Sequence, residues 1–188
     1  IKSIEAYQVY ALAKSMCLKM KGNLAEVGVY TGGTARLICD AKGDNPLFLF
    51  DTFEGLPKVS KEDTPMNDRQ LLFVEGHFSK DNIQNEVKDY LKKYPNVFIH
   101  KGLFPKETSK NVVNKKFIFV HLDVDLYSST LECLKFFYPR MEEGGIILTH
   151  DYFISAGVMK AYKEFFKNKK EVIIELVGHQ AIIVKSKK

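Results

Sequence analysis

Short apolar runs alternate with longer stretches of helical periodicity along most of this chain. Each run is bounded by Gly, Pro, Asn or Asp, which is typical of strands. Several runs are apolar at every position, a pattern typical of strands that are covered on both faces of a sheet. The sequence predicts strands at 24–28, 47–50, 97–100, 117–123, 144–149, 172–177 and 181–185.

Between these runs the periodicity predicts helices at 3–20, 33–42, 79–93, 128–138 and 155–167. In the first helix Ile4, Tyr7, Ala11 and Leu18 are among the apolar positions, which makes the helix amphipathic. Ser79 is expected to cap the third helix, because a serine side chain accepts a hydrogen bond from the first turn. Strands that alternate with helices predict an α/β fold with a parallel sheet.

The last two predicted strands are joined only by Gly178, His179 and Gln180. A parallel pair needs a crossover of about a dozen residues or more, so these two strands must be antiparallel. The predicted fold class is therefore a Rossmann-like α/β domain, with a mostly parallel sheet, an antiparallel last strand and helices on both faces. The 188 residues contain no internal repeat, and we expect a single domain over 1–188, with an N-terminal helix within 1–22.

Residues 52–70, TFEGLPKVSKEDTPMNDRQ, are polar, contain two prolines and a glycine, and show no periodicity. A loop of this length in a compact domain is usually a lid, a binding loop or a disordered connection. It follows a predicted parallel strand, and open α/β sheets bind their ligands at the carboxyl ends of strands. We therefore predict a lid over the ligand, with a flexible connection as the alternative.

The sequence at 25–34, AEVGVYTGGT, predicts a strand end, a glycine-rich turn and a helix start. This arrangement receives nucleotide-like ligands in parallel α/β sheets. Tyr30 stands where the dinucleotide fingerprint requires its second glycine, and the chain has no P-loop motif. Glu26, two residues before Gly28, would repel a phosphate and attract an ammonium group. S-adenosylmethionine carries an ammonium group and no phosphate, so it fits better than NAD; a turn without a ligand is the alternative.

Asp51 ends the second strand, 23 residues after Gly28 (51 − 28). An acid at about this distance from the glycine turn usually accepts hydrogen bonds from both ribose hydroxyls. Gly102 and Phe104 follow the next strand at the same edge of the sheet, where Phe104 would form an apolar wall for adenine. The alternatives are a helix-capping aspartate and a phenylalanine of the core.

Acidic residues also follow two later strands, in HLDVDLY at 121–127 and THDY at 149–152. Because the carboxyl ends of neighbouring strands meet at one edge, Asp123, Asp125, His150 and Asp151 are expected to converge. Acids are rarely buried without a partner, so a divalent cation would explain this group. A cation would also lower the pKa of an alcohol, which is about 16, and so make it a nucleophile at neutral pH. Strand-end caps and salt bridges are the alternative.

Two further histidines, His77 and His179, lie in predicted loops. An imidazole close to a ligand can act as a general base at neutral pH. For each of them, a solvated loop histidine is the alternative.

The formal net charge is +5, and lysines carry almost all of the basic side, because the only arginines are Arg36, Arg69 and Arg140. Nucleic-acid readers use arginine forks and aromatic platforms, so we predict a solvated surface and no nucleic-acid partner. No apolar run approaches the roughly 20 residues of a membrane span, and the first residues lack the apolar core of a signal peptide. Three widely separated cysteines fit a reduced compartment. We therefore expect a cytoplasmic protein without membrane contact.

Four segments follow one another in the order AEVGVYTGGTARLI, LFDTFEGLP, GLFP and FVHLDVDLYSSTLECLKFFYPRMEEGGIILTHDY. Together they resemble the macrocin O-methyltransferase (TylF) family, over nearly the whole of Asn23 to Ala161. The resemblance implies a class I S-adenosylmethionine-dependent enzyme that methylates hydroxyls, often on sugars of antibiotics or polysaccharides. It also implies a seven-stranded sheet with an antiparallel last strand.

The resemblance further implies a Mg²⁺ site made by one acid after the fourth strand and two acids after the fifth. The matching positions are Asp123, His150 and Asp151. Where the family usually has Asp-Asp-Tyr, this chain has His150-Asp151-Tyr152. Imidazole suits Mn²⁺, Fe²⁺ or Zn²⁺ better than it suits Mg²⁺. Either the metal differs, or it binds weakly, or His150 acts as a base without a metal.

The leading hypothesis is an S-adenosylmethionine-dependent O-methyltransferase that acts on a hydroxyl of a small molecule, such as a sugar or a natural product, with Mg²⁺ or Mn²⁺. Asp123 and His150 are the expected catalytic residues, and Asp123, His150 and Asp151 the expected metal ligands. The alternatives are a nicotinamide-dependent Rossmann oxidoreductase, which Tyr30 and the reversed hairpin disfavour, and a non-catalytic cofactor-binding protein. A homodimer is an open alternative to a monomer. The residues expected to bind the cofactor are Glu26, Gly28, Tyr30, Gly32, Thr34, Asp51, Phe53, Gly102, Phe104 and Asp123.

Overall fold

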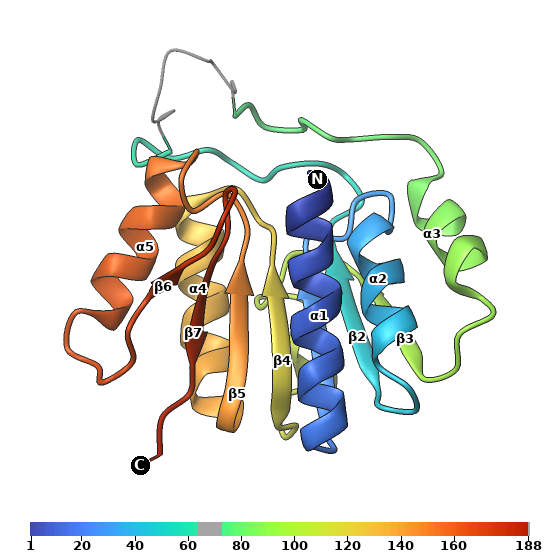
Figure 1. Ribbon diagram of the computed structural model, residues 1–188. Helices are drawn as coiled ribbons and strands as arrows, with labels where there is room; N and C mark the ends of the chain where they lie inside the picture. Colours follow the sequence, from blue (N-terminus) through green and yellow to red (C-terminus); the bar gives the residue numbers. More distant parts are fainter. Residues whose placement is uncertain (64–72, 188) are drawn as a thin grey trace.

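A seven-stranded sheet, in the order β3-β2-β1-β4-β5-β7-β6, forms the middle layer of the fold (Figure 1). The computed structural model describes residues 1–63 and 73–187, so residues 64–70 of the predicted lid lie outside the described residues. The strands are β1 (Asn23–Val27), β2 (Leu47–Asp51), β3 (Val97–Lys101), β4 (Phe117–Leu122), β5 (Met141–Thr149), β6 (Ile174–Glu175) and β7 (Ala181–Val184). The helices are α1 (Ser3–Lys19), α2 (Gly33–Ala41), α3 (Ile83–Leu91), α4 (Tyr127–Phe137) and α5 (Ala156–Phe166), with 3₁₀ turns at Ser109–Asn111 and Tyr138–Arg140.

The direction of the strands follows the prediction. Strands β1 to β5 pair in parallel, and β7 is antiparallel to both β5 and β6. Only residues 176–180 separate β6 from β7, which is too short a connection for a parallel crossover. The predicted fold class, a mostly parallel α/β sheet with an antiparallel last strand, is confirmed.

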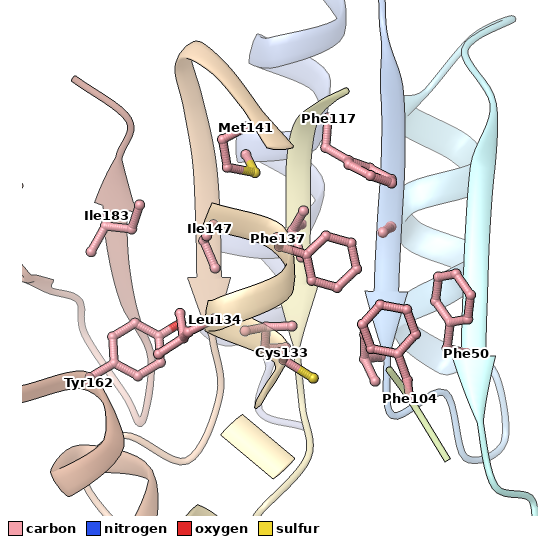
Figure 2. Close-up of a cluster of buried hydrophobic side chains, with 14 of the residues drawn as sticks. Phe50, Phe104, Phe117, Cys133, Leu134, Phe137, Met141, Ile147, Tyr162 and Ile183 are labelled. Carbon is pink, nitrogen blue, oxygen red and sulfur yellow. The ribbon is translucent and has the colours of Figure 1, made fainter. Parts of the chain in front are cut away.

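Helices cover both faces of the sheet, with α1, α2 and α3 on one face and α4 and α5 on the other (Figure 1). Strands β2 and β4 are consequently buried at almost every position, which explains their continuous apolar sequences. Figure 2 shows the core between the sheet and α4, where the Phe104 and Phe137 rings stack with centroids 4.9 Å apart.

The face that α1 buries differs from the prediction. Ile4, Tyr7 and Leu18, predicted among its apolar positions, are exposed. Apolar residues occur on two sides of this helix, so the periodicity alone does not select the buried side. The buried residues of α1 are Glu5, Val9, Ala13 and Met16.

Helix α3 is shorter than predicted and does not begin after Ser79. Asn82, directly before the helix, has a left-handed backbone with φ of 59°. This conformation interrupts a right-handed helix, and the amide of Ser79 instead donates to the Gly76 carbonyl at 3.0 Å in a turn. The third helix therefore covers only residues 83–91 of the predicted range 79–93.

The last part of the sheet also differs in its boundaries. Strand β5 begins at Met141, three residues before the predicted start at 144, and continues through Gly144, whose φ is 78°. The strand predicted at 172–177 is reduced to Ile174–Glu175 at the edge of the sheet. The flanking residues of this edge strand, Val172 and Val177, are exposed.

The register brings four of the predicted site residues into one row at the carboxyl edge of the sheet. In the parallel pairs, Val27 lies opposite both Phe50 and Leu122. The next residue of each strand continues the ladder, so Gly28, Asp51, Asp123 and His150 come from four neighbouring strands. Three backbone hydrogen bonds of 2.9 Å connect these strand ends. The Gly28 amide donates to the Phe50 carbonyl, the Asp123 amide to the Val27 carbonyl, and the His150 amide to the Leu122 carbonyl.

Among the helices that the structure describes, none combines the length and the apolar character that crossing a bilayer requires.

Candidate functional site

A cavity of about 840 Å³ opens at the carboxyl edge of the sheet, above the row of strand ends. The glycine-rich turn and the ends of β2, β4 and β5 surround it, together with residues from 52–57 of the predicted lid and from 73–78 after it. Most of the predicted site residues contribute to its wall. These are Gly28, Tyr30, Thr34, Asp51, Phe53, Gly102, Phe104, Asp123, His150 and Asp151.

Gly28 is required where β1 ends, because two backbone segments meet there. Its φ is 86°, and a Cβ atom at this position would lie 1.8 Å from the Asp123 carbonyl oxygen. No side chain can be accommodated at that distance, so a substitution would separate β1 from the end of β4. The glycine turn and the acidic cluster are therefore held together through backbone contact.

Asp51 fixes the glycine turn by accepting hydrogen bonds from three backbone amides. Its Oδ2 accepts from Val29 at 2.6 Å and from Tyr30 at 2.8 Å, and its Oδ1 accepts from Phe53 at 2.6 Å. A carboxylate has about four acceptor sites, so one remains for a ribose hydroxyl. The ribose contact itself stays a prediction, and the structure adds that Asp51 shapes the binding loop.

Two aromatic residues of the cavity wall have strained backbones. Tyr30 has φ of 47° and Phe53 has φ of 53°, a region that side chains with a Cβ adopt rarely. The Tyr30 ring packs edge-on against Phe78, which follows the predicted lid, with the centroids 5.5 Å apart. Strained residues of this kind cluster at ligand-binding sites, where the surrounding contacts maintain them.

Phe104 belongs to both the core and the cavity wall. It is 4 % exposed, and its ring packs against Phe50 and Phe137 (Figure 2). Phe104 can therefore be a core residue and also a wall for adenine, because a core ring can present one edge to a ligand. Its contact with adenine stays a prediction.

Glu26 and Gly32 do not line the cavity. Glu26 is fully buried within β1, and its Oε1 lies 2.8 Å from Nδ1 of the equally buried His121 in β4. Burial raises the pKa of Glu26, and the hydrogen bond from His121 opposes this rise. Gly32 precedes α2 with φ of 81° and faces Val87 of α3. Their positions do not support direct contact with the cofactor, which stays a prediction for both.

The acidic cluster combines two carboxylates with one imidazole. Nδ1 of His150 lies 3.0 Å from Oδ1 of Asp123 and 3.9 Å from Oδ1 of Asp151. One ligand atom from each of the three residues can be chosen so that all lie within 4.8 Å of one another. This spacing and this donor set fit a divalent cation that accepts both oxygen and nitrogen.

The charges of the cluster are strongly coupled. Burial lowers the pKa of His150, but the hydrogen bond to Asp123 and the negative charges of Asp123, Asp151 and Glu5 outweigh it and raise this pKa to about 10. Burial and the charge of Asp123 raise the pKa of Asp151 to about 6. Without a metal, a protonated His150 therefore supplies the positive charge that the neighbouring carboxylates require.

Comparison with known proteins assigns the chain to a family. The family model described as macrocin-O-methyltransferase (TylF) matches residues 8–181. The chain belongs to the macrocin O-methyltransferase (TylF) family. The resemblance inferred from the sequence motifs is therefore confirmed.

Curated relatives of the chain are named as O-methyltransferases. A Streptomyces olivaceus protein, 8-demethyl-8-(2,3-dimethoxy-alpha-L-rhamnosyl)-tetracenomycin-C 4'-O-methyltransferase, is 31 % identical over 144 residues, covering 72 % of this chain and 54 % of the relative. The mycinamicin III 3''-O-methyltransferase of Micromonospora griseorubida is 30 % identical over 145 residues, covering 72 % and 57 %. The chain thus spans about half the length of these curated relatives.

Solved structures confirm the fold. The O-methyltransferase NovP superposes with a TM-score of 0.74 at 21 % identity, covering 97 % of this chain and 80 % of NovP. The calicheamicin methyltransferase CalS11 has a TM-score of 0.78 at 18 % identity, covering 96 % of this chain and 78 % of CalS11. At these identities the likeness concerns the arrangement of strands and helices alone.

Asp125 lies at the same edge of the sheet, as the sequence predicted without assigning it a role. It lines the cavity, has φ of 57°, and its carbonyl accepts a hydrogen bond from Ser155 Oγ at 2.8 Å. Burial and the negative charges of Asp151 and Asp123 raise its pKa well above the usual range. The feature of the sequence that could have identified Asp125 is the alternation in HLDVD, in which one residue separates Asp123 from Asp125.

The two loop histidines differ in their positions. His77 lines the cavity from the turn that follows the predicted lid. His179 lies behind the site, where its Nε2 is 2.9 Å from Lys2 Nζ. His77 therefore remains a candidate base because it lines the cavity, whereas His179 does not line the cavity.

Backbone hydrogen bonds join the first part of the predicted lid to residues 76 and 77, which follow it. The Leu56 amide donates to the His77 carbonyl at 2.8 Å, and the Gly76 amide donates to the Leu56 carbonyl at 2.9 Å. We expect cofactor binding to slow hydrogen exchange at the Leu56 and Gly76 amides, because ligand contacts on these two segments suppress local opening. Exchange mass spectrometry with and without S-adenosylhomocysteine measures this, with the Val120 amide in the core as control. Equal exchange in both states would count against a lid.

The buried pair of Glu26 and His121 is expected to contribute strongly to stability. Glu26→Ala leaves His121 without its buried partner, and breaking such a pair costs about 3–5 kcal/mol. The exposed pair of Glu132 and Lys135 provides a matched control, because Glu132→Ala should cost roughly 1 kcal/mol or less. Urea unfolding measures both free energies. Similar values for the two variants would show that the buried pair is not important for the fold.

Proposed function

We propose that this protein is an S-adenosylmethionine-dependent O-methyltransferase that methylates a hydroxyl of a small molecule, such as a sugar or a natural product. One observation carries the proposal: the glycine turn with Asp51 and the acidic cluster of Asp123, His150 and Asp151 face the same cavity. Membership in the TylF family supports it, and so do the names of the relatives, which specify hydroxyl positions on glycosylated compounds.

The cofactor side of the cavity lies over β1 and β2. Asp51 holds the turn that contains Gly28 in place, and its remaining acceptor site would receive a ribose hydroxyl. Phe104 offers an apolar edge for the adenine ring. These residues would orient the methyl group towards the acidic cluster, and methyl transfer gains most of its rate from such positioning.

The acceptor side of the cavity lies over β4 and β5. Asp123, His150 and Asp151 would hold a divalent cation, which when bound would orient the acceptor hydroxyl and lower its pKa. In the transfer, the acceptor oxygen forms a bond to the methyl carbon while the carbon–sulfur bond breaks. The hydroxyl proton must leave, and the carboxylate of Asp125 or the imidazole of His77 lines the same cavity and could accept it.

Two alternatives predict different ligands. A nicotinamide oxidoreductase would need a pyrophosphate at the glycine turn, where Tyr30 stands and no second glycine is present. A non-catalytic protein would bind the cofactor without turnover, and His150 would then mark the loss of an acid from the metal site.

Two measurements separate the three functions. Calorimetry should detect binding of S-adenosylhomocysteine and no binding of NADH. Incubation with methyl-labelled S-adenosylmethionine and a metabolite extract should then transfer label to an extractable compound that carries a hydroxyl. NADH binding in place of S-adenosylhomocysteine would establish the oxidoreductase, and cofactor binding without transfer to any acceptor would establish the non-catalytic protein.

A further inference from the structure

One acidic residue of the N-terminal helix reaches the acidic cluster from outside the cavity. Helix α1 begins at the carboxyl edge of the sheet, where the N-terminus lies close to the ends of β4 and β5 (Figure 1). Glu5, in the first turn of this helix, is only 1 % exposed. A buried acid at this position requires partners, and the partners identify its role.

Glu5 is held firmly by backbone donors. The Lys2 amide donates to its Oε2 at 2.8 Å, and the His179 amide donates to its Oε1 at 3.0 Å. Gly178 closes over the same side chain, because a Cβ on this glycine would lie 2.7 Å from Oε1 of Glu5. The carboxylate therefore has a fixed position between α1 and the final hairpin.

The same carboxylate faces the outer nitrogen of His150. Oε2 of Glu5 lies 3.4 Å from Nε2 of His150, an ion-pair contact, while Nδ1 on the opposite side of the ring faces Asp123 at 3.0 Å. Among the described residues, no other acid lies within ion-pair distance of this Nε2. The imidazole ring is thus placed between the carboxylate of Glu5 and the cluster.

A histidine that binds a cation through one nitrogen must carry its proton on the other. In metal sites that proton is generally donated to a carboxylate, which fixes the orientation of the ring and increases the basicity of the ligand nitrogen. Nε2 of His150 is buried and makes no hydrogen bond to any described residue, and Oε2 of Glu5 lies within ion-pair distance of it at 3.4 Å. A proton on Nε2 would therefore be directed towards Glu5, and the lone pair of Nδ1 towards Asp123 and Asp151.

We propose that Glu5 is a positioning residue that orients His150 as the nitrogen ligand of the acidic cluster. The proposal rests on the metal-assisted function proposed above and adds a residue from outside the matched family region, which begins at residue 8. The proposal also connects the histidine at position 150 with the buried carboxylate of Glu5. The family acid at position 150 has no N–H to donate, whereas His150 has one, and Glu5 accepts it.

The alternative role of Glu5 is structural, because its contacts with Lys2 and His179 alone would attach α1 to the hairpin. A double-mutant cycle separates the two roles. Glu5→Gln should weaken Mn²⁺ binding, measured by calorimetry, by about 10- to 100-fold. In the His150→Asp background the same substitution should cause no loss, because no ring remains to be oriented. Gln8→Ala, which removes the 3.2 Å contact between α1 and the Val177 carbonyl, is the matched structural control and should leave Mn²⁺ affinity unchanged.

A second readout does not depend on metal binding. In protein with ¹⁵N-labelled histidine, the Nε2 proton of His150 should exchange slowly with water, and Glu5→Gln should broaden or abolish its NMR signal. An unchanged signal would overturn the proposal, as would equal losses of Mn²⁺ affinity in both backgrounds or in Gln8→Ala. If wild-type protein binds no Mn²⁺, the metal-assisted function fails, and the NMR result alone decides whether Glu5 positions the ring.

Discussion

Removal of divalent cations is expected to reduce methyl transfer roughly 100-fold or more, and Mn²⁺ should restore more activity than Mg²⁺. Asp123 and Asp151 follow adjacent strands and face one imidazole nitrogen, so a cation between them would relieve their repulsion. Affinity for nitrogen ligands rises along the transition series, and His150 supplies the nitrogen. The measurement is the initial rate with labelled cofactor after EDTA treatment and after addition of each ion.

The pH dependence of metal affinity should follow the protonation of His150. Its pKa is about 10, because the surrounding carboxylates outweigh the effect of burial. A cation must therefore displace one proton from the ring throughout the neutral range. Apparent affinity should rise about tenfold per pH unit between roughly pH 7 and 9. Below about pH 6, where Asp151 also gains a proton, affinity should fall more steeply.

His150→Asp provides the control for the preference for Mn²⁺ and for the pH dependence of metal affinity. The substitution restores the acid pair that is usual in the TylF family, so the preference should shift towards Mg²⁺. The dependence on pH between 7 and 9 should largely disappear, because a carboxylate is already deprotonated there. Full activity in EDTA, together with an Asp123→Asn variant that retains normal rates, would reject the metal.

Asp51→Ala is expected to weaken cofactor binding by tenfold or more while the sheet remains folded. The substitution removes the acceptor of three backbone amides and the expected acceptor of a ribose hydroxyl. Hydrogen bonds to a charged group contribute roughly 1.5–3 kcal/mol each, and the turn that contains Tyr30 would lose its anchor. Calorimetry with S-adenosylhomocysteine measures the affinity, and circular dichroism verifies the fold.

Asp51→Asn distinguishes the two roles of this carboxylate. The amide retains one acceptor oxygen, so part of the turn geometry should survive, and the loss of affinity should be smaller than in Asp51→Ala. Unchanged affinity in both variants would refute the assignment of Asp51 to the cofactor site.

The sequence by itself determined the succession of strands along the chain and their directions. Continuous apolar runs occur where both faces of the sheet are covered, and the three-residue link at Gly178 to Gln180 allows only an antiparallel pair. It also located the carboxyl edge, because Gly28, Asp51, Asp123 and His150 each follow an apolar run. Parallel pairing then places such strand ends together without further information.

The tertiary structure decided which side chains meet behind that edge. Periodicity did not select the buried face of α1, since apolar residues lie on two of its sides, and close packing placed Glu5 beside His150. The position of Glu26 before the glycine turn predicts a cofactor ligand, and this stays a prediction, while the pairing of β1 with β4 places Glu26 beside His121. These contacts join residues 95 or more positions apart along the chain. Local patterns cannot encode such contacts, because they depend on how whole elements pack against each other.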